Sequence, residues 1–343
     1  MNRFAWTTPR TMEDAAAAAS TTVAHAMFSR TARPSPDGAI FKAGGIDLLD
    51  LMKEGLLTPR HLVNLRTLPG LDRIRQENRG VLRIGTNVTL AQLAADPLVR
   101  ECYRALADAV AQSASPQIRQ VATIGGNLLQ RPRCWYFRSR HHHCVRKGGD
   151  SCFAFAGENR HHAIFDHNGC AMVHPSTAAT ALVAFGASVV LTDVKATRRI
   201  VRIDDFFVRP ETDIQRENDL RPGELLTSIL LPPLAPGARS VHLRQGEKDS
   251  FDWPIADVAV VLDIGPDRVC RGAAVVLGAA APVPHRAKAA EGTLIGTPID
   301  EEVARAAGRA ALTGAAPLTQ NAYKLPIFET LVRRAILAAN GSA

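Results

Sequence analysis

The chain has 343 residues, of which 46% are hydrophobic, so it is long enough for two or three domains with their own cores. Its net charge of +8 comes from scattered lysines and arginines, and aromatic residues make up only 5% of the chain. A nucleic-acid surface combines a basic stripe with stacking rings, so we expect no nucleic acid as a partner. An anionic cofactor or an acidic protein partner is compatible with the charge.

We expect neither a membrane span nor an export signal in this sequence. No apolar run approaches the roughly 20 residues that cross a bilayer, so we expect no membrane insertion. The first 20 residues, MNRFAWTTPRTMEDAAAAAS, lack the aliphatic segment of a signal peptide. The expected location is cytoplasmic, or periplasmic by export together with a partner.

The first two thirds of the chain alternate between helical and strand-like patterns. Thr89 and Gln92 form a capping-box pattern, and Ser176 precedes a helix that Gly186 ends. In chain order we expect a helix at 13–30, a break at 33–38, a strand, glycine turn and helix within 40–55, strands at 61–65 and 81–90, helices at 89–95, 100–112 and 176–185, and a strand at 187–192. The alternation indicates an α+β fold.

A proline-rich stretch at 231–237, LPPLAPG, is the clearest linker in the chain. After it we expect strands at 255–264 and 268–279, joined by a turn at 265–267, and two helices beyond Asp300. We therefore divide the chain into a domain of residues 1–235 and a smaller domain of residues 236–343.

Two glycine pairs are candidate cofactor loops. Gly44 and Gly45 separate a strand from a helix, so backbone N–H groups and the positive end of the helix can converge on a pyrophosphate. Gly125 and Gly126 follow Thr123 and permit a second phosphate or ribityl contact. The alternative for each pair is a plain turn. Neither pair matches the Rossmann or P-loop pattern.

Four of the six cysteines gather in one loop-like segment, with the spacing C-x9-C-x7-C-x17-C. They are Cys134, Cys144, Cys152 and Cys170. An irregular loop can bring four thiolates to an iron–sulfur cluster whatever their spacing. Cys102 and Cys270 fall in helix and strand patterns, and we interpret both as core residues.

Two alternatives to a cluster stay open for this segment. Structural zinc is one, because seven histidines lie nearby: His141, His142, His143, His161, His162, His167 and His174. Zinc sites usually contain a close C-x2-4-C pair, however, and none occurs here. Unliganded or disulfide-bonded cysteines are the other alternative. We assign no histidine as a ligand.

Together these segments resemble a known family. AGGIDLLDLMK, ATIGGNLLQRPRCWYF, a cysteine-rich insertion, HPSTAATALVAFGASVVL and GELLTSILLPP follow one another as in the FAD-binding subunits of the xanthine dehydrogenase family of molybdenum hydroxylases. The insertion, at about 128–172, is most similar to that of the [4Fe-4S]-containing flavin subunits of bacterial periplasmic aldehyde oxidoreductases.

The resemblance implies an α+β fold in which a two-subdomain FAD-binding domain of the vanillyl-alcohol-oxidase (PCMH) type precedes a smaller α+β domain like the C-terminal domain of CO dehydrogenase flavoproteins. FAD would lie between the subdomains. The implied cofactor-binding residues are Ile40, Phe41, Lys42, Ala43, Gly44, Gly45, Ile46, Asp47, Leu48, Thr123, Ile124, Gly125, Gly126, Asn127, Thr177, Leu226 and Arg244. The implied cluster ligands are the four grouped cysteines.

Three of these positions need comment. Leu226 corresponds to a position whose backbone meets the isoalloxazine in relatives. Arg244 stands where the family usually has a lysine near the flavin, and it keeps the positive charge on a planar head. Thr177 replaces an aspartate that contacts the cofactor in relatives, and a role in the first turn of a helix is the alternative for it.

No molybdopterin-binding region and no C-x4-C-x2-C motif for [2Fe-2S] occur in the sequence. The resemblance therefore implies a heterotrimer with a large molybdopterin-binding subunit and a small [2Fe-2S] subunit. In it this chain would pass electrons through FAD to an external acceptor and would supply no acid/base catalyst. The alternatives are a zinc-stabilised nucleotide-binding module without redox activity, and the flavin subunit of a related hydroxylase acting on an N-heterocycle or an aromatic acyl-CoA.

Overall fold

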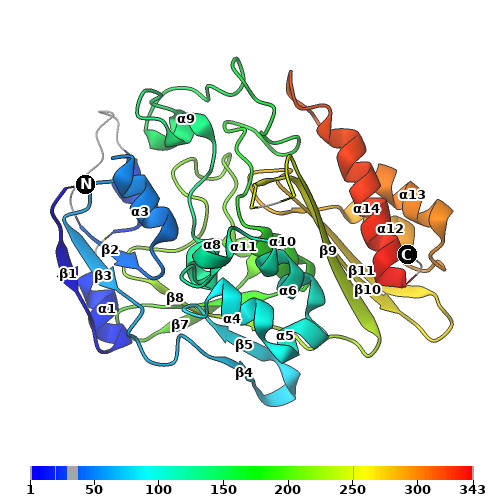
Figure 1. Ribbon diagram of the computed structural model, residues 1–343, viewed down its shortest axis with the longest axis horizontal. Helices are drawn as coiled ribbons and strands as arrows, with labels where there is room; N and C mark the ends of the chain where they lie inside the picture. Colours follow the sequence, from blue (N-terminus) through cyan, green and yellow to red (C-terminus); the bar gives the residue numbers. More distant parts are fainter. Residues whose placement is uncertain (1, 20, 29–37, 250, 342–343) are drawn as a thin grey trace.

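Three β-sheets organise the described residues, and the first sheet is parallel (Figure 1). The computed structural model describes residues 2–19, 21–28, 38–249 and 251–341. The first sheet has the order β1-β3-β2. This subdomain contains β1 (Ala5–Thr7), α1 (Met12–Ala18), α2 (Val23–Met27), β2 (Ala39–Lys42), α3 (Ile46–Lys53) and β3 (His61–Asn64). One face of α3, with Leu48, Leu51 and Met52, packs with Ile40 and Leu62 in its core. The predicted strand, glycine turn and helix are confirmed here.

The single helix predicted for residues 13–30 is wrong, because two short helices form instead. Ala19 leaves the helical conformation with a ψ of 122°. Thr22 then begins α2, and its hydroxyl accepts a hydrogen bond from the His25 amide. The end of the predicted helix and most of the predicted break lie in residues 29–37, which are outside the described residues.

The second subdomain is an antiparallel sheet of order β4-β5-β8-β6-β7 with helices around it. Its strands are β4 (Ile74–Gln76), β5 (Leu82–Gly85), β6 (Ser188–Thr192), β7 (Arg198–Arg202) and β8 (Leu225–Leu231), and its helical elements are the 3-10 turn η1 (Asn78–Gly80), α4 (Leu90–Ala95), α5 (Pro97–Cys102), α6 (Arg104–Ala111), α7 (Pro116–Arg119), α8 (Ile124–Leu128), α10 (Thr177–Ala184) and α11 (Ile203–Phe206). Every residue of α10 is buried, because this apolar helix packs against α6 and the third sheet.

Two predictions in this subdomain need correction. Three are confirmed: the helices at 89–95 and 176–185, which form α4 and α10, and the strand at 187–192, which forms β6. Of the strand predicted for 81–90, only residues 82–85 form a strand, which is β5. The helix predicted for 100–112 breaks at Tyr103, whose φ and ψ are −125° and 51°. Its hydroxyl donates to the Pro232 carbonyl at 2.8 Å and its ring packs edge-on against Phe185, so tertiary contacts fix the break. The capping box of Thr89 and Gln92 forms as predicted.

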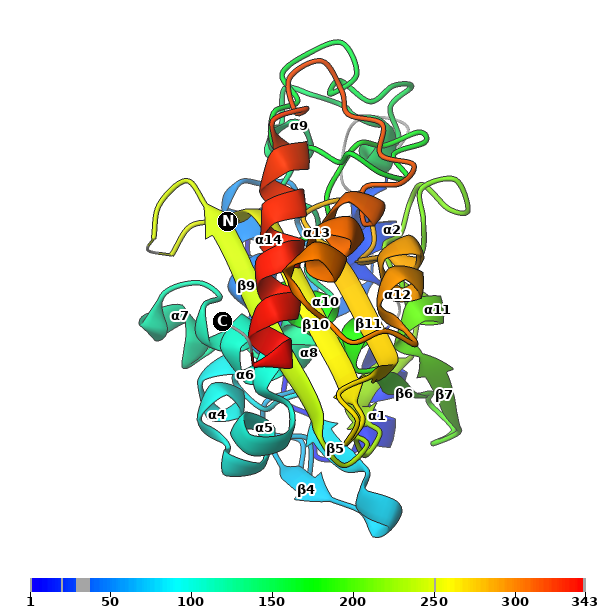
Figure 2. The ribbon, with the colours of Figure 1, turned by 90° about the vertical axis from the view of Figure 1, so that its right-hand side faces the viewer.

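The C-terminal part is a four-stranded antiparallel sheet of order β12-β11-β10-β9. Its elements are β9 (Ala238–Gly246), β10 (Pro254–Ile264), β11 (Cys270–Gly278), β12 (His285–Arg286), α12 (Lys288–Leu294), α13 (Glu301–Ala310) and α14 (Lys324–Asn340). The three helices cover one face of the sheet, and α6 and α10 pack on the other (Figure 2). The predicted strand pair and the two final helices are confirmed, whereas β9 and α12 were not predicted. Cys270 is buried as predicted, but Cys102 is exposed, so the core interpretation of Cys102 is wrong.

The segment between α8 and α10 is mostly irregular, which agrees with the predicted insertion. It contains only the short helix α9 (Trp135–Arg138) and the 3-10 turn η2 (Val145–Lys147). In Figure 1 it projects at the top of the molecule, beside α3. Phe137 and Cys144 join the core that α3 forms, so the insertion is anchored to the first subdomain.

Among the described residues, none of the helices combines the length and the apolar character that a membrane crossing demands.

Candidate functional site

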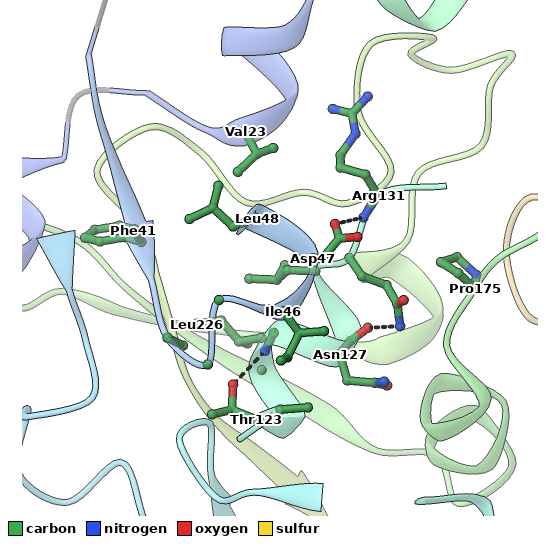
Figure 3. Close-up of a pocket in the computed structure, with 18 of the residues that line it drawn as sticks. Val23, Phe41, Ile46, Asp47, Leu48, Thr123, Asn127, Arg131, Pro175 and Leu226 are labelled. Atoms are coloured by element: carbon green, nitrogen blue, oxygen red, sulfur yellow. Dashed lines mark hydrogen bonds between the residues drawn. The ribbon is translucent and has the colours of Figure 1, made fainter. Parts of the chain in front are cut away.

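A cavity of about 500 Å³ opens between the first and second subdomains (Figure 3). This volume falls within the range of small-molecule and cofactor pockets. All of the predicted cofactor residues except Ile124 line it. Ile124 is instead fully buried in the core of the second subdomain. Segments from β2, α3, α8, β8 and β9, which lie far apart in the sequence, thus meet around one space.

The first glycine loop presents free backbone donors to this cavity. It leads directly into α3, whose N-cap is Gly45 and therefore carries no capping side chain. Among the described residues, no acceptor is found for the amides of Gly45, Ile46 and Asp47. Free amides at the positive end of a helix form a ready binding site for a phosphate group.

Both glycines of this first loop are required by the local geometry. Gly45 has a φ of +83°, in the left-handed region that side chains disfavour. A methyl group at Gly44 would overlap the carbonyl oxygen of Val121, which belongs to the segment before the second glycine pair. The loop can therefore approach the second subdomain only without a side chain at this position.

The second glycine pair lies inside the short helix α8, and its backbone donors are already used. The Gly125 amide donates to Thr86 O at 3.0 Å, and the Gly126 amide donates to Thr123 Oγ1 at 3.1 Å. A Cβ on Gly125 would lie 2.7 Å from that of Thr86. This pair therefore permits close packing of α8 on the Thr86 segment. It leaves the Asn127 side chain, whose Oδ1 accepts from Ser176 Oγ at 2.5 Å, at the cavity wall.

Three further predicted residues line the cavity from other elements. The Thr177 hydroxyl lies 2.7 Å from Ser113 Oγ and donates to the Ala109 carbonyl, so it is engaged with α6 and its neighbourhood. Leu226 is the second residue of β8, and its carbonyl accepts from Thr86 Oγ1 at 2.8 Å. Arg244, on β9, donates to the Gln112 carbonyl at 2.8 Å, which holds its guanidinium at the cavity edge.

Sequence reasoning missed several residues that line the cavity. Arg131 and Glu217 are both buried there, and the loop before β10 contributes the exposed rings of Phe251 and Trp253. The Trp253 ring centroid lies 4.9 Å from the guanidinium of Arg133. Two aromatic residues in the polar stretch KDSFDWP were a signal for this loop. Nothing local in the sequence marked Glu217.

Asp47 connects the first glycine loop to the start of the insertion rather than facing a phosphate. Its Oδ2 accepts from the Arg131 amide at 2.9 Å (Figure 3). Its Oδ1 lies 2.6 Å from Arg138 Nη2 and 2.9 Å from Arg133 Nη2. The more exposed Asp50 pairs with the same two arginines at 3.1 Å. Because Cys134 lies between these arginines in the chain, the cavity and the cysteine segment are mechanically joined.

The four grouped cysteines are free thiols and lie near one another in the insertion. Burial raises the pKa of Cys134 to about 12, and the neighbouring Cys170 and Cys144 raise it further. The pKa of Cys170 is lowered, first by a hydrogen bond from Cys152 and then by the Arg146 guanidinium. The same hydrogen bond raises the pKa of Cys152. The thiols therefore influence one another's protonation, which separated core cysteines do not.

Buried side-chain nitrogens without hydrogen-bond partners are concentrated in the insertion. Eight buried side-chain nitrogens lack a hydrogen-bond partner within the described residues, and seven of them belong to residues 131–162. These seven are Arg131 Nε, Nη1 and Nη2, Arg133 Nε, His143 Nε2, Arg146 Nη2 and His162 Nδ1. Five of the seven belong to arginines, which can only donate. An unpaired buried donor costs about 1–3 kcal/mol, so these five cationic donors fit an anionic acceptor.

Within the described ranges, no three His, Cys, Asp or Glu side chains are close enough to share a single metal ion. In a four-iron cluster each thiolate binds a different iron, so the ligands surround a larger group. The donor chemistry of the insertion, four thiols flanked by buried cations, is of the type that such an anionic cluster takes.

Comparison with protein-family models finds two matches that together span most of the chain. Residues 2–234 match the model described as the FAD binding domain in molybdopterin dehydrogenase, and residues 242–339 match the CO dehydrogenase flavoprotein C-terminal domain.

Individual relatives agree with these matches. The chain is 35% identical to the aldehyde oxidoreductase FAD-binding subunit PaoB of Escherichia coli (strain K12) over 308 residues, covering 89% of this chain and 93% of that protein. It is 28% identical to the carbon monoxide dehydrogenase medium chain of Hydrogenophaga pseudoflava, covering 87% of this chain and 88% of that one. These two relatives act on different substrates, so likeness at this level does not by itself define the substrate.

Solved structures share the fold. A chain of carbon monoxide dehydrogenase from Hydrogenophaga pseudoflava superposes with a TM-score of 0.73 at 24% identity, covering 100% of this chain and 99% of that one. Quinoline 2-oxidoreductase from Pseudomonas putida 86 gives a TM-score of 0.73 at 23% identity, covering 99% of this chain and 98% of that one. The predicted α+β fold class is confirmed.

Proposed function

Because this chain belongs to the family of FAD-binding subunits of molybdenum-dependent oxidoreductases, we propose that it is the FAD and [4Fe-4S] electron-transfer subunit of a heterotrimeric aldehyde oxidoreductase. A large molybdopterin-binding subunit would oxidise the aldehyde, and a small [2Fe-2S] subunit would relay the electrons to this chain. FAD takes up electrons in pairs or singly, and an iron–sulfur cluster carries them one at a time.

The observation that carries the FAD assignment is the cavity with its unpaired helix donors. The amides of Gly45, Ile46 and Asp47 would hold the pyrophosphate, because they have no acceptor among the described residues. Lys42 and Arg244 add positive charge at the cavity wall. The backbone at Leu226 and the side chain of Asn127 would contact the remaining part of the cofactor. The role of this protein would be to bind and orient the cofactor, because the flavin itself supplies the redox chemistry.

The cluster assignment to Cys134, Cys144, Cys152 and Cys170 is supported by the charge around them. The buried Arg146 donates to Cys170 Sγ at 3.3 Å, and Lys147 is buried nearby. Cations buried beside thiols favour the thiolate form that binds iron. Zinc is the alternative occupant, and metal analysis of the purified chain distinguishes it from an iron–sulfur cluster.

The aldehyde assignment follows the higher identity to the aldehyde oxidoreductase subunit, at 35%, compared with 25–28% for relatives that are named for nicotinate, carbon monoxide or nicotine. The experiment is anaerobic addition of an aromatic aldehyde to the complex purified with its co-produced large and small subunits. We expect bleaching of the oxidised-flavin absorbance, followed in a stopped-flow instrument. Bleaching by an N-heterocycle or an aromatic acyl-CoA, but not by the aldehyde, would contradict the substrate class.

A further inference from the structure

A line of buried charges joins the cofactor cavity to the grouped cysteines. Arg131 and Glu217 both line the cavity, and Arg131 Nε lies 3.2 Å from Glu217 Oε2. On its other side, Glu217 Oε1 accepts from Arg146 Nη1 at 2.8 Å. Arg146 Nε then donates to Cys170 Sγ at 3.3 Å. The line contains three charged side chains and ends on a thiol.

These residues come from three separate parts of the chain, so their meeting is a product of the fold. Arg131 follows α8, Arg146 lies in η2 within the insertion, and Glu217 lies between α11 and β8. Their side chains are 2%, 1% and 5% exposed. Water therefore screens them poorly, and each charge acts on its neighbours more strongly than a surface charge would.

The line carries an excess of positive charge. Two guanidinium groups share one carboxylate, and Arg131 Nη1 and Nη2 and Arg146 Nη2 lack partners among the described residues. Other charges that face the group from nearby segments are Asp47 and Arg138, beside Arg131. An uncompensated buried cation is unfavourable unless an anion lies close to it. The Cys170 sulfur is the acceptor that Arg146 contacts.

We propose that Arg146 is a positioning residue that raises the reduction potential of the cluster held by the four cysteines, and that Glu217 limits this effect. The inference rests on the proposed function, because it requires the cluster. Hydrogen bonds to ligand sulfurs and nearby positive charge stabilise the reduced, more negative form of an iron–sulfur cluster. Glu217 works in the opposite direction, because it neutralises the same guanidinium.

The experiment is an EPR-monitored redox titration of the cluster in the purified complex. Arg146→Met removes the donor and the charge, whereas Arg146→Lys keeps the charge without the guanidinium geometry. Glu217→Gln keeps an acceptor for Arg146 and removes the negative charge. Arg160→Gln is the matched control, since Arg160 is an exposed arginine of the insertion whose side chain contacts His161 and the Trp135 ring.

We expect the potential to become more negative in Arg146→Met, to shift less in Arg146→Lys, to become more positive in Glu217→Gln and to stay unchanged in Arg160→Gln. Potential shifts of opposite sign in Arg146→Met and Glu217→Gln indicate electrostatic control of the cluster potential. Structural damage would instead shift both potentials in the same direction or remove the cluster. An unchanged potential in Arg146→Met, or a shift of equal sign in Glu217→Gln, overturns the inference. If Arg146→Met loses its iron, the direction of the potential shift in Glu217→Gln decides the matter: a more positive potential supports the inference, and any other result overturns it. A wild-type complex with this chain's flavin but without its cluster overturns the cluster assignment as well.

Discussion

The cavity and the insertion differ in how their polar groups are satisfied. At the cavity the amides of Gly125 and Gly126 bond to protein oxygens, and Ser176 bonds to Asn127. In the insertion, by contrast, seven buried nitrogens have no partner within the described residues. Native proteins rarely leave buried donors unpaired. The α8 wall of the cavity is thus paired within the protein, whereas the first glycine loop and the insertion, including Arg131 and Arg133 where it borders the cavity, leave buried or N-terminal donors free for a bound group.

This difference indicates where each cofactor contributes to folding. We expect FAD to enter a cavity that is largely formed before binding. We expect the cluster to stabilise the loop that binds it, as metals do when their ligands have no ordered structure of their own. Variants on each side of the contrast test it.

Replacing one grouped cysteine should disrupt the insertion and spare the cavity. We expect Cys144→Ser to lose this subunit's cluster iron and to make residues 131–170 cleavable by protease, while FAD stays bound, because the α8 wall of the cavity is paired internally. Iron analysis, flavin fluorescence after denaturation and limited proteolysis measure the three effects. The control is Cys102→Ser at an exposed position, which should keep its iron. Retention of iron in Cys144→Ser would contradict the ligand assignment.

Closing the first glycine loop should damage the cavity and spare the insertion. In Gly44→Ala the added methyl overlaps Val121 O, which should displace the loop, lower FAD content at least tenfold and reduce the free energy of unfolding by about 1–3 kcal/mol. Flavin content and urea unfolding give these values. Gly292→Ala on α12 is the matched control, because no heavy atom lies within 4 Å of the added methyl group. We expect this control to leave the free energy of unfolding unchanged or to raise it slightly. If Gly44→Ala keeps its full FAD content, the pyrophosphate does not bind at the first glycine loop.

The link between the two regions should break at Asp47. Asp47→Ala leaves the half-buried Arg133 and Arg138 with only Asp50, so we expect both FAD and iron to fall, with a loss of about 2 kcal/mol in the free energy of unfolding. Asp50→Ala is the comparison. Asp50 pairs with the same arginines but its side chain is 45% exposed, so we expect a loss below about 1 kcal/mol. Equal effects of the two variants would show that Asp47 has no special linking role.

A buried histidine beside the cavity should make stability sensitive to acid. Burial lowers the pKa of His174 to about 3, and its Nδ1 accepts from the Ser176 amide. Because the unfolded chain binds a proton at His174 near pH 6.5 and the folded chain does not, stability is present above that pH and falls as pH drops toward 3. From pH 7 to pH 5.5 we expect His174 to account for a loss of about 1 kcal/mol. Urea unfolding measures the free energy of unfolding of wild type and His174→Gln at both pH values. The difference between their pH-dependent losses is the contribution of His174. An identical pH dependence in both proteins would contradict it.

Local sequence rules predicted those parts of the fold whose signals are local. The capping box at Thr89, the helix capped by Ser176 and the strand pair after residue 254 formed as expected, since caps and apolar periodicity act over a few residues. The break at Tyr103 was missed because a hydrogen bond to Pro232, distant in sequence, holds it. The single helix predicted for 13–30 also failed, because α1 ends before Ala19 and Thr22 caps a new helix.

The candidate site shows the same limit. Glycine pairs and cysteines are visible in the sequence, and the structure places both pairs at one cavity. Their different roles were not visible, because Gly125 packs on Thr86 and Gly44 on Val121, contacts that only the fold creates. Glu217 had no local signal at all. Its role depends on a buried position between Arg131 and Arg146, which sequence spacing does not reveal.

The most direct test is the iron, acid-labile sulfide and flavin content of this subunit separated from its partners. We expect one FAD with about four iron atoms and about four sulfides per chain, and a yellow-brown colour with a broad shoulder beyond the flavin bands. Zinc in place of iron, or a chain with iron and no flavin, would contradict the proposal that one chain joins an FAD cavity to an iron–sulfur insertion.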